Sequence, residues 1–193
     1  MKKFLKRALA VLVAVLILAS SLCFGVGAED NTVSQKKFKS LSGLKVIFFG
    51  DSITRAKSDG RGWPARLNDM YGFRECLNEG VSGATIAGEA GNRIITPVRN
   101  CQKKHPDTDL VILHGGTNDA WQGFPLGEIS EGFDVKNVDI STTAGALEYL
   151  LFHTKRMYPN AGVGFIVNFK FVGANSKLDN MQNYVDTIIA ILE

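Results

Sequence analysis

Short apolar runs alternate along the chain with amphipathic segments. Residues 45–49, 110–113 and 163–167 are apolar runs of the kind that form buried parallel strands. A weaker strand is expected at 73–77. Helical spacing predicts helices between these strands, at 63–70, within 92–104, at 141–157, and from Leu178 to Leu192 with Ser176 as a cap.

This alternation of strands and helices predicts a parallel sheet with helices on both faces. Ligands of such sheets bind beyond the carboxyl ends of the strands. The segments 50–61, 78–91 and 114–139 each follow a predicted strand. Any chemistry is therefore expected in these three segments.

The first 28 residues have the three regions of a secretory signal peptide, in the usual order. A basic start precedes the apolar run 8–19, and small residues end the segment at Val26-Gly27-Ala28. We expect cleavage after Ala28 and secretion of the protein, with an uncleaved membrane anchor as the alternative. Residues 29–43 are expected to be a linker, and 44–193 the folded domain.

The net charge of the chain becomes slightly negative once the predicted signal segment is set aside. The remainder carries 18 basic and 19 acidic residues, a net charge of −1. Such a balance argues against nucleic acid or a membrane as a partner. Cys76 and Cys101 remain after cleavage, either as a disulfide or as two buried thiols. No cysteine or histidine spacing suggests a metal site.

Each of the three segments holds residues that catalysis could use. Ser52 follows the first strand, where it could act as a nucleophile or merely cap the next helix. The glycine-rich stretch 78–85 could bring backbone N–H groups close to a ligand, or be a plain turn. Asn118 follows the second strong strand and could donate to an oxyanion, although Asn-Asp after Gly-Thr is also a turn signal.

Together the three segments resemble the SGNH (GDSL) hydrolase family of esterases and lipases. Gly50-Asp51-Ser52 matches its first block, 78–83 its second, and Gly116-Thr117-Asn118-Asp119 its third. The resemblance runs from about Lys45 to the end of the chain and implies Ser52 as nucleophile. It also implies an oxyanion hole formed by Gly83, Asn118 and the Ser52 amide.

The resemblance implies a flavodoxin-like three-layer α/β/α fold with a parallel sheet of about five strands. It also implies ester hydrolysis through an acyl-enzyme, with no metal or organic cofactor. The expected partner is a small-molecule or glycan ester. Neither nucleic acid nor stable membrane association after signal cleavage is expected.

The Asp-x-x-His block of the family has no match here. None of His105, His114 and His153 has an aspartate three residues before it. His114 could replace the base, or be a packed residue at the strand end. Because an amphipathic helix ends the sequence, we expect a fragment that lacks the last strand and the catalytic loop. Such a fragment should show weak or no esterase activity; a base-free binding relative is the alternative.

Residues 120–139 form a long predicted connection that holds three aromatic side chains. Trp121 and Phe124, together with Asp51, are expected to contact substrate. Alternatively, the aromatic residues, including Phe133, pin the connection to the body. Short acyl groups on carbohydrate are the expected substrate, because no broad apolar lid is evident. A non-catalytic receptor for glycans or acyl groups is the competing hypothesis.

Overall fold

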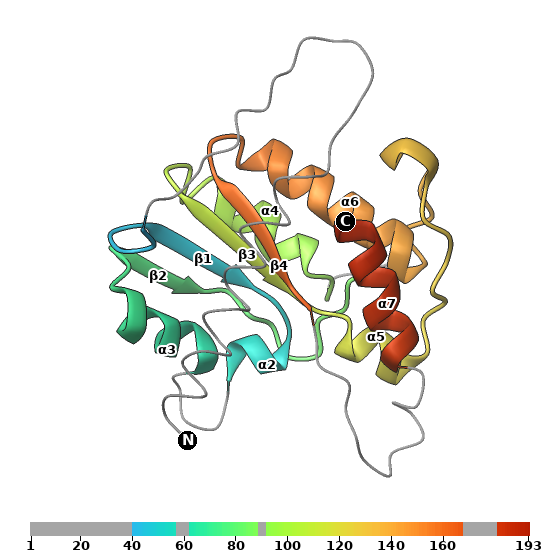
Figure 1. Ribbon diagram of the computed structural model, residues 1–193, viewed down its shortest axis with the longest axis horizontal. Helices are drawn as coiled ribbons and strands as arrows, with labels where there is room; N and C mark the ends of the chain where they lie inside the picture. The colour runs from blue at the N-terminus through green and yellow to red at the C-terminus, as the bar shows by residue number, and fades with distance from the viewer. Residues whose placement is uncertain (1–39, 57–61, 89–91, 168–180) are drawn as a thin grey trace.

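The protein is represented by a computed structural model that describes residues 40–56, 62–88, 92–167 and 181–193. Four strands form one parallel sheet in the order β2-β1-β3-β4 (Figure 1). The predicted strands are confirmed to within two residues at each end: β1 (Lys45–Phe49), β2 (Glu75–Asn78), β3 (Leu110–His114) and β4 (Gly162–Ile166).

The predicted helices are confirmed as well, with adjusted ends: α3 (Gly62–Tyr71), α4 (Ile95–Gln102), α6 (Thr143–Met157) and α7 (Met181–Leu192). Helix α4 lies within the expected segment 92–104, and the chain before it pairs with another loop, Arg93 forming a parallel bridge with Thr85. Two short helices, α2 (Ser52–Arg55) and α5 (Thr117–Gln122), were not predicted. The proposed cap Ser176 lies outside the described residues.

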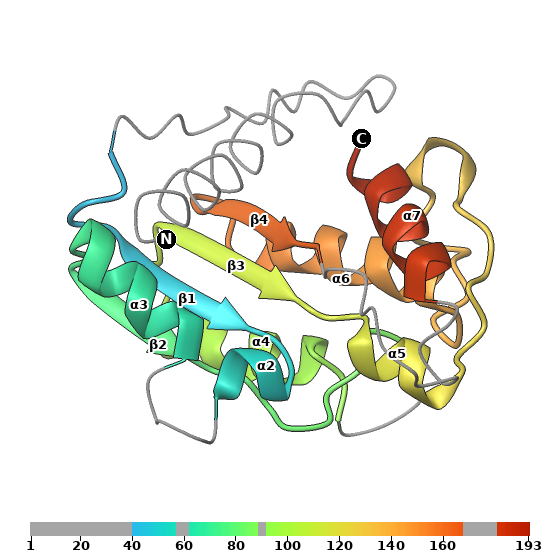
Figure 2. The same cartoon turned by 60° about the horizontal axis from the view of Figure 1, so that its bottom comes forward.

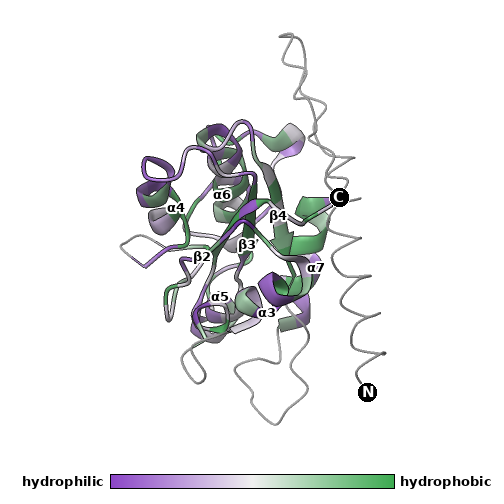
Figure 3. Ribbon diagram, turned by 90° about the vertical axis from the view of Figure 1, so that its left-hand side faces the viewer, coloured by the Kyte–Doolittle hydropathy of each residue, from purple (hydrophilic) through white to green (hydrophobic). Residues whose placement is uncertain are grey.

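Helices cover the sheet from both sides, which confirms the three-layer fold. Ile47 and Phe49 of β1 pack in the core under α4 and α6. Val46 and Phe48 point the opposite way and pack against α3, whose Leu67 is buried there. Figure 2 shows α3 on one side of the sheet and α4 and α6 on the other. The hydropathy colouring of Figure 3 places hydrophobic residues along β3 and β4, between the layers.

The order of the strands fixes where a site can lie. From β1 the chain passes to β2 on one side, and then crosses to β3 on the other side of β1. Helix α3 belongs to the first crossover and α4 to the second, on opposite faces. Loops therefore diverge at the carboxyl ends of β1 and β3, which creates the crevice where flavodoxin-like sheets bind ligands. The loops after these two strands begin with Gly50 and Gly115.

The two cysteines are free thiols, so the disulfide alternative is excluded. Cys76 packs with Val46 and Phe48 on the α3 side of the sheet. Cys101 belongs to α4 and packs in the core on the other side. The sheet itself separates the two sulfur atoms.

The predicted signal segment 1–28 and most of the linker 29–43 lie outside the described residues. Among the helices that the structure does describe, none is long and apolar enough to cross a membrane.

Candidate active site

The loop after β1 presents Ser52 at the surface. Asp51 caps α2, its Oδ1 accepting a hydrogen bond of 2.9 Å from the Ile53 amide. The capping role considered for Ser52 is thus filled by its neighbour, and Ser52 itself is exposed. Gly50 is required for this turn, because a Cβ there would lie 2.2 Å from Thr54 Oγ1 and 2.8 Å from the His114 carbonyl oxygen.

The loop after β2 is fastened to the Ser52 loop. The Val81 amide donates to the Gly50 carbonyl at 2.8 Å, and Asn78 Nδ2 donates to the Thr54 carbonyl at 2.8 Å. Two residues beyond Val81, Gly83 has φ of +76°, a conformation that favours glycine. These bonds hold Gly83 in a turn that is tied directly to the Ser52 loop.

The loop after β3 is fastened in turn to the Gly83 loop. Gly116, with φ of +101°, leads into α5, which carries Asn118 and Asp119 in its first turn. Asn118 Nδ2 donates to the carbonyl of Ala84 at 2.8 Å. Since a carboxamide has two N–H groups, Asn118 keeps a second donor beside Gly83. All three predicted blocks therefore meet at one edge of the sheet, linked by direct hydrogen bonds.

Asp119 fixes the relation between the second and third loops. Its carboxylate is fully buried and accepts from the Ile86 amide at 3.0 and 3.1 Å and from the Ala87 amide at 2.8 Å. Burial raises the pKa of Asp119 to about 6, against the lowering effect of these amides. Asp119 stands in the third motif, but its role in joining two loops was not predicted.

Asp51 is also fully buried, so its carboxylate presents no exposed surface to a substrate. Its Oδ1 lies 3.7 Å from His114 Nδ1, in addition to capping α2. We therefore correct the expected substrate contact of Asp51 to a role in shaping the Ser52 loop.

His114 is a packed strand-end residue, the second of the two roles considered for it. It is 5% exposed, and its Nδ1 is hydrogen-bonded to Thr54 Oγ1 at 3.1 Å. The Trp63 ring lies against its imidazole, with 6.0 Å between the centroids. His114 thereby joins the end of β3 to the helix that starts at Ser52.

Replacing His114 should therefore affect stability. We expect His114→Phe to lower the free energy of unfolding by about 1–2 kcal/mol, because Thr54 loses a buried partner. His114→Asn, which keeps a polar atom near the position of Nδ1, should lose less than half of that. Urea unfolding followed by fluorescence measures both values. Equal losses in the two variants would show that the Thr54 bond contributes nothing.

The other two histidines lie away from Ser52. His105 follows α4 at the opposite end of the sheet from Ser52. There, at the amino ends of the strands, the Asp109 amide donates to the Lys45 carbonyl. His153 lies on α6, with its ring centroid 4.0 Å from that of Tyr149. No histidine of the described chain is thus placed as a base for Ser52. In the same residues, no cluster of potential metal ligands occurs.

The aromatic residues after β3 divide into two groups. Residues 117–122 form α5 rather than loop, because Gly116 and Gly123 in left-handed conformations delimit this helix. Phe124 and Phe133 pack against the core, and the Phe124 ring lies over Gly88, so these two pin the connection. Trp121 remains 44% exposed on α5, three residues from Asn118. Of the aromatic residues expected to contact substrate, Trp121 is the one the structure leaves accessible.

Comparisons with known proteins agree with this arrangement. The family model of the GDSL-like lipase/acylhydrolase family matches residues 48–192. A proposed GDSL-like lipase from Bacteroides ovatus has a similar structure, with a TM-score of 0.53, 24% identity, and coverage of 78% of this chain and 80% of that chain. A proposed GDSL-like lipase from Bacteroides uniformis gives a TM-score of 0.55 and 22% identity, covering 78% and 80%.

A protein from Lactobacillus plantarum gives a TM-score of 0.59 at 23% identity, with 78% of this chain and 72% of that chain covered. Identities this low show the fold alone. No curated protein sequence matches the chain.

The parallel sheet with helices on both faces, and the three linked loops at the carboxyl ends of its strands, define a flavodoxin-like three-layer α/β/α protein. With the match over 48–192, the chain belongs to the GDSL-like lipase/acylhydrolase family. Membership places it among hydrolases of carboxylic esters.

Proposed function

We propose that this protein is an exported serine esterase that removes short acyl groups from carbohydrate through an acyl-enzyme. Ser52 Oγ attacks the ester carbonyl, and the alcohol leaves with a proton. Water then cleaves the acyl-serine and regenerates Ser52. The negative charge on the carbonyl oxygen is stabilised by the amides of Ser52 and Gly83 and by the free N–H of Asn118.

The bond from Asn118 Nδ2 to the Ala84 carbonyl carries this proposal. It places the side-chain donor of the third loop beside the backbone donor of the second, and Asp119 holds the same two loops together. The exposed Ser52 lies on the first loop, after β1, which is hydrogen-bonded to the second. An oxyanion hole requires donors that converge on one position, and these three loops could supply them.

A serine needs a proton acceptor, and the described histidines do not supply one. Added imidazole tests whether the remaining machinery is competent, because it can diffuse to an exposed serine and take its proton. We expect imidazole to increase the hydrolysis of p-nitrophenyl acetate by the purified protein at least tenfold above the Ser52→Ala variant. Both rates are corrected for hydrolysis by imidazole alone.

The competing hypothesis is a non-catalytic receptor for glycans or acyl groups. Under that hypothesis, the protein and Ser52→Ala would give the same rate at every imidazole concentration. Mass spectrometry after reaction with a fluorophosphonate in imidazole gives a second readout. A single adduct on Ser52 supports the esterase, and an adduct elsewhere contradicts it.

A further inference from the structure

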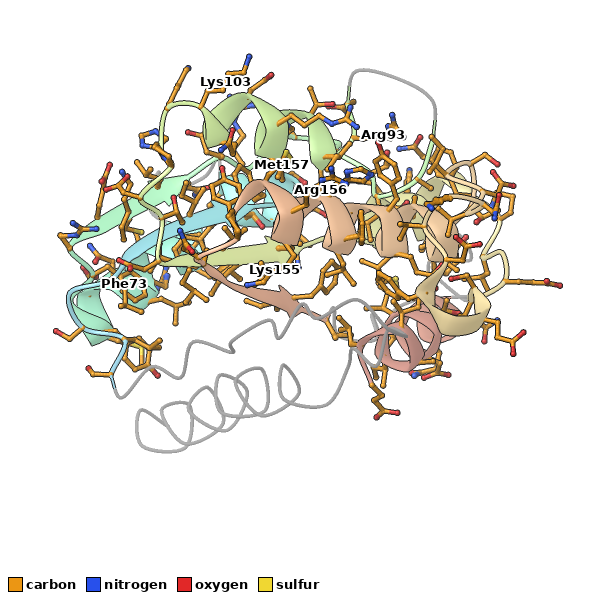
Figure 4. The ribbon with its side chains drawn as sticks, turned by 90° about the horizontal axis from the view of Figure 1, so that it is seen from above. Phe73, Arg93, Lys103, Lys155, Arg156 and Met157 are labelled. Atoms are coloured by element: carbon orange, nitrogen blue, oxygen red, sulfur yellow. The ribbon has the colours of Figure 1, made fainter. Side chains whose placement is uncertain are left out.

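Helices α4 and α6 present a surface that carries cations and almost no carboxylates. Arg99 on α4 and Lys103 just after it are exposed, as is Arg156 on α6. Helix α4 has no acidic residue, and the sole acidic residue of α6, Glu148, is fully buried. Figure 4 shows Lys103 and Arg93 near opposite ends of α4, with Arg156 on the neighbouring α6.

Three charged groups near this surface make their contacts elsewhere. Asp107 binds Lys45 at 2.8 Å at the amino end of the sheet. Glu79 lies close to Cys101 of α4. Burial is the main reason why the pKa of the Cys101 thiol is raised, and the Glu79 carboxylate raises it further. Lys155 donates to the carbonyl of Ala161 at 2.8 Å.

In the part of the chain that the structure describes, Arg99, Lys103 and Arg156 form no ion pair. We call these three side chains the basic face. The net charge of −1 over residues 29–193 therefore hides an uneven distribution over the surface.

Aromatic rings lie between these cations. Arg99 Nη2 donates to the Tyr149 hydroxyl at 2.5 Å, and the guanidinium carbon is 5.8 Å from the centroid of that ring. His153 contacts Tyr149 with its ring tilted by 45°, and it touches the Phe152 ring edge-on, at 5.3 Å between centroids. A guanidinium held in place by an aromatic ring loses less entropy when it binds an anion.

Helix α4 connects the basic face to the candidate active site. It runs from the carboxyl end of β2 to the amino end of β3, antiparallel to the strands. Its beginning is attached to the catalytic loops, since Arg93 pairs with Thr85, two residues beyond Gly83. At about 1.5 Å per residue, the ten positions from Arg93 to Lys103 extend roughly 15 Å away from those loops.

We propose that the basic face binds a carboxylate-bearing polysaccharide, the polymer that carries the acyl esters. Carboxylates of a linear chain would pair with Arg99, Lys103 and Arg156, because a guanidinium matches a carboxylate with two parallel hydrogen bonds. Sugar rings would lie against the exposed parts of Tyr149 and Phe152. The polymer would then reach the catalytic loops along α4. The choice of polymer rests on the proposed esterase function, whereas the binding itself does not require catalysis.

Binding of fluorescein-labelled polygalacturonate, followed by fluorescence anisotropy at low ionic strength, tests the proposal. We expect Arg99→Glu and Lys103→Glu each to weaken binding about tenfold, and the double variant more. Lys136→Glu makes the same charge change on the exposed connection after α5, and should leave the affinity unchanged. Labelled dextran, which has no charge, should not bind.

Ser52→Ala separates this proposal from the proposed function. It should bind polygalacturonate as tightly as the unchanged protein even if no esterase activity is found. Equal weakening by Lys136→Glu and Arg99→Glu would overturn the basic face as a specific site. Tighter binding of a labelled oligothymidylate than of polygalacturonate would also overturn it, in favour of a nucleic acid.

Discussion

Asp119→Ala is expected to lower the free energy of unfolding by about 3 kcal/mol at about pH 5. Two buried amides, those of Ile86 and Ala87, lose their acceptor, and each unsatisfied buried amide costs roughly 1–3 kcal/mol. The cavity left by the carboxyl adds to this loss. Asp119→Asn is the matched control, because its carbonyl oxygen can still accept from both amides. Urea unfolding should show a loss of about 1 kcal/mol or less for this variant.

The ionisation of Asp119 makes a second, independent check possible. Burial raises the pKa of Asp119 to about 6 in the folded protein, above its ordinary value of 3.8. The folded state therefore holds this proton more tightly than the unfolded chain does. The contribution of Asp119 to stability is fully present below pH 3.8 and is lost as pH rises through about 6.

The stability of the unchanged protein relative to Asp119→Asn should accordingly fall between about pH 4 and 7. A constant difference between the two proteins over this range would contradict the raised pKa.

Asn118→Ala should reduce the imidazole-dependent hydrolysis of p-nitrophenyl acetate by roughly 10²–10³-fold, the usual cost of removing one side-chain donor from an oxyanion hole. The donor acts on the charge that develops in the transition state, so the effect should appear in kcat rather than in KM. Initial rates at a fixed imidazole concentration measure both constants.

The same substitution also removes the bond to the Ala84 carbonyl. This bond is worth about 1 kcal/mol of stability, which urea unfolding can report separately. Asn137→Ala removes a carboxamide that bonds only locally, to Asp134, and should leave the rate unchanged. A rate for Asn118→Ala within threefold of the unchanged protein, with normal folding, would remove Asn118 from the oxyanion hole.

Much of the fold could be predicted because its signals are local. The strands β1 and β3 are unbroken apolar runs, and the apolar stripe of α7 repeats at helical spacing. Helix α5 was missed because six residues between two glycines are too few to show a periodic pattern. Phe124 was expected at the substrate because its own segment does not show that its ring packs over Gly88 in a distant loop.

The sequence by itself determined the type of sheet and the family resemblance through three short motifs, and it indicated Ser52, Gly83 and Asn118 as candidate site residues. These features depend on hydrophobic periodicity and on the order of residues within each turn. The tertiary structure alone decided that Cys76 and Cys101 stand on opposite faces and that His114 packs behind the nucleophile loop. It also decided that the exposed cations of α4 and α6 share one surface, since contacts between distant segments are set by packing.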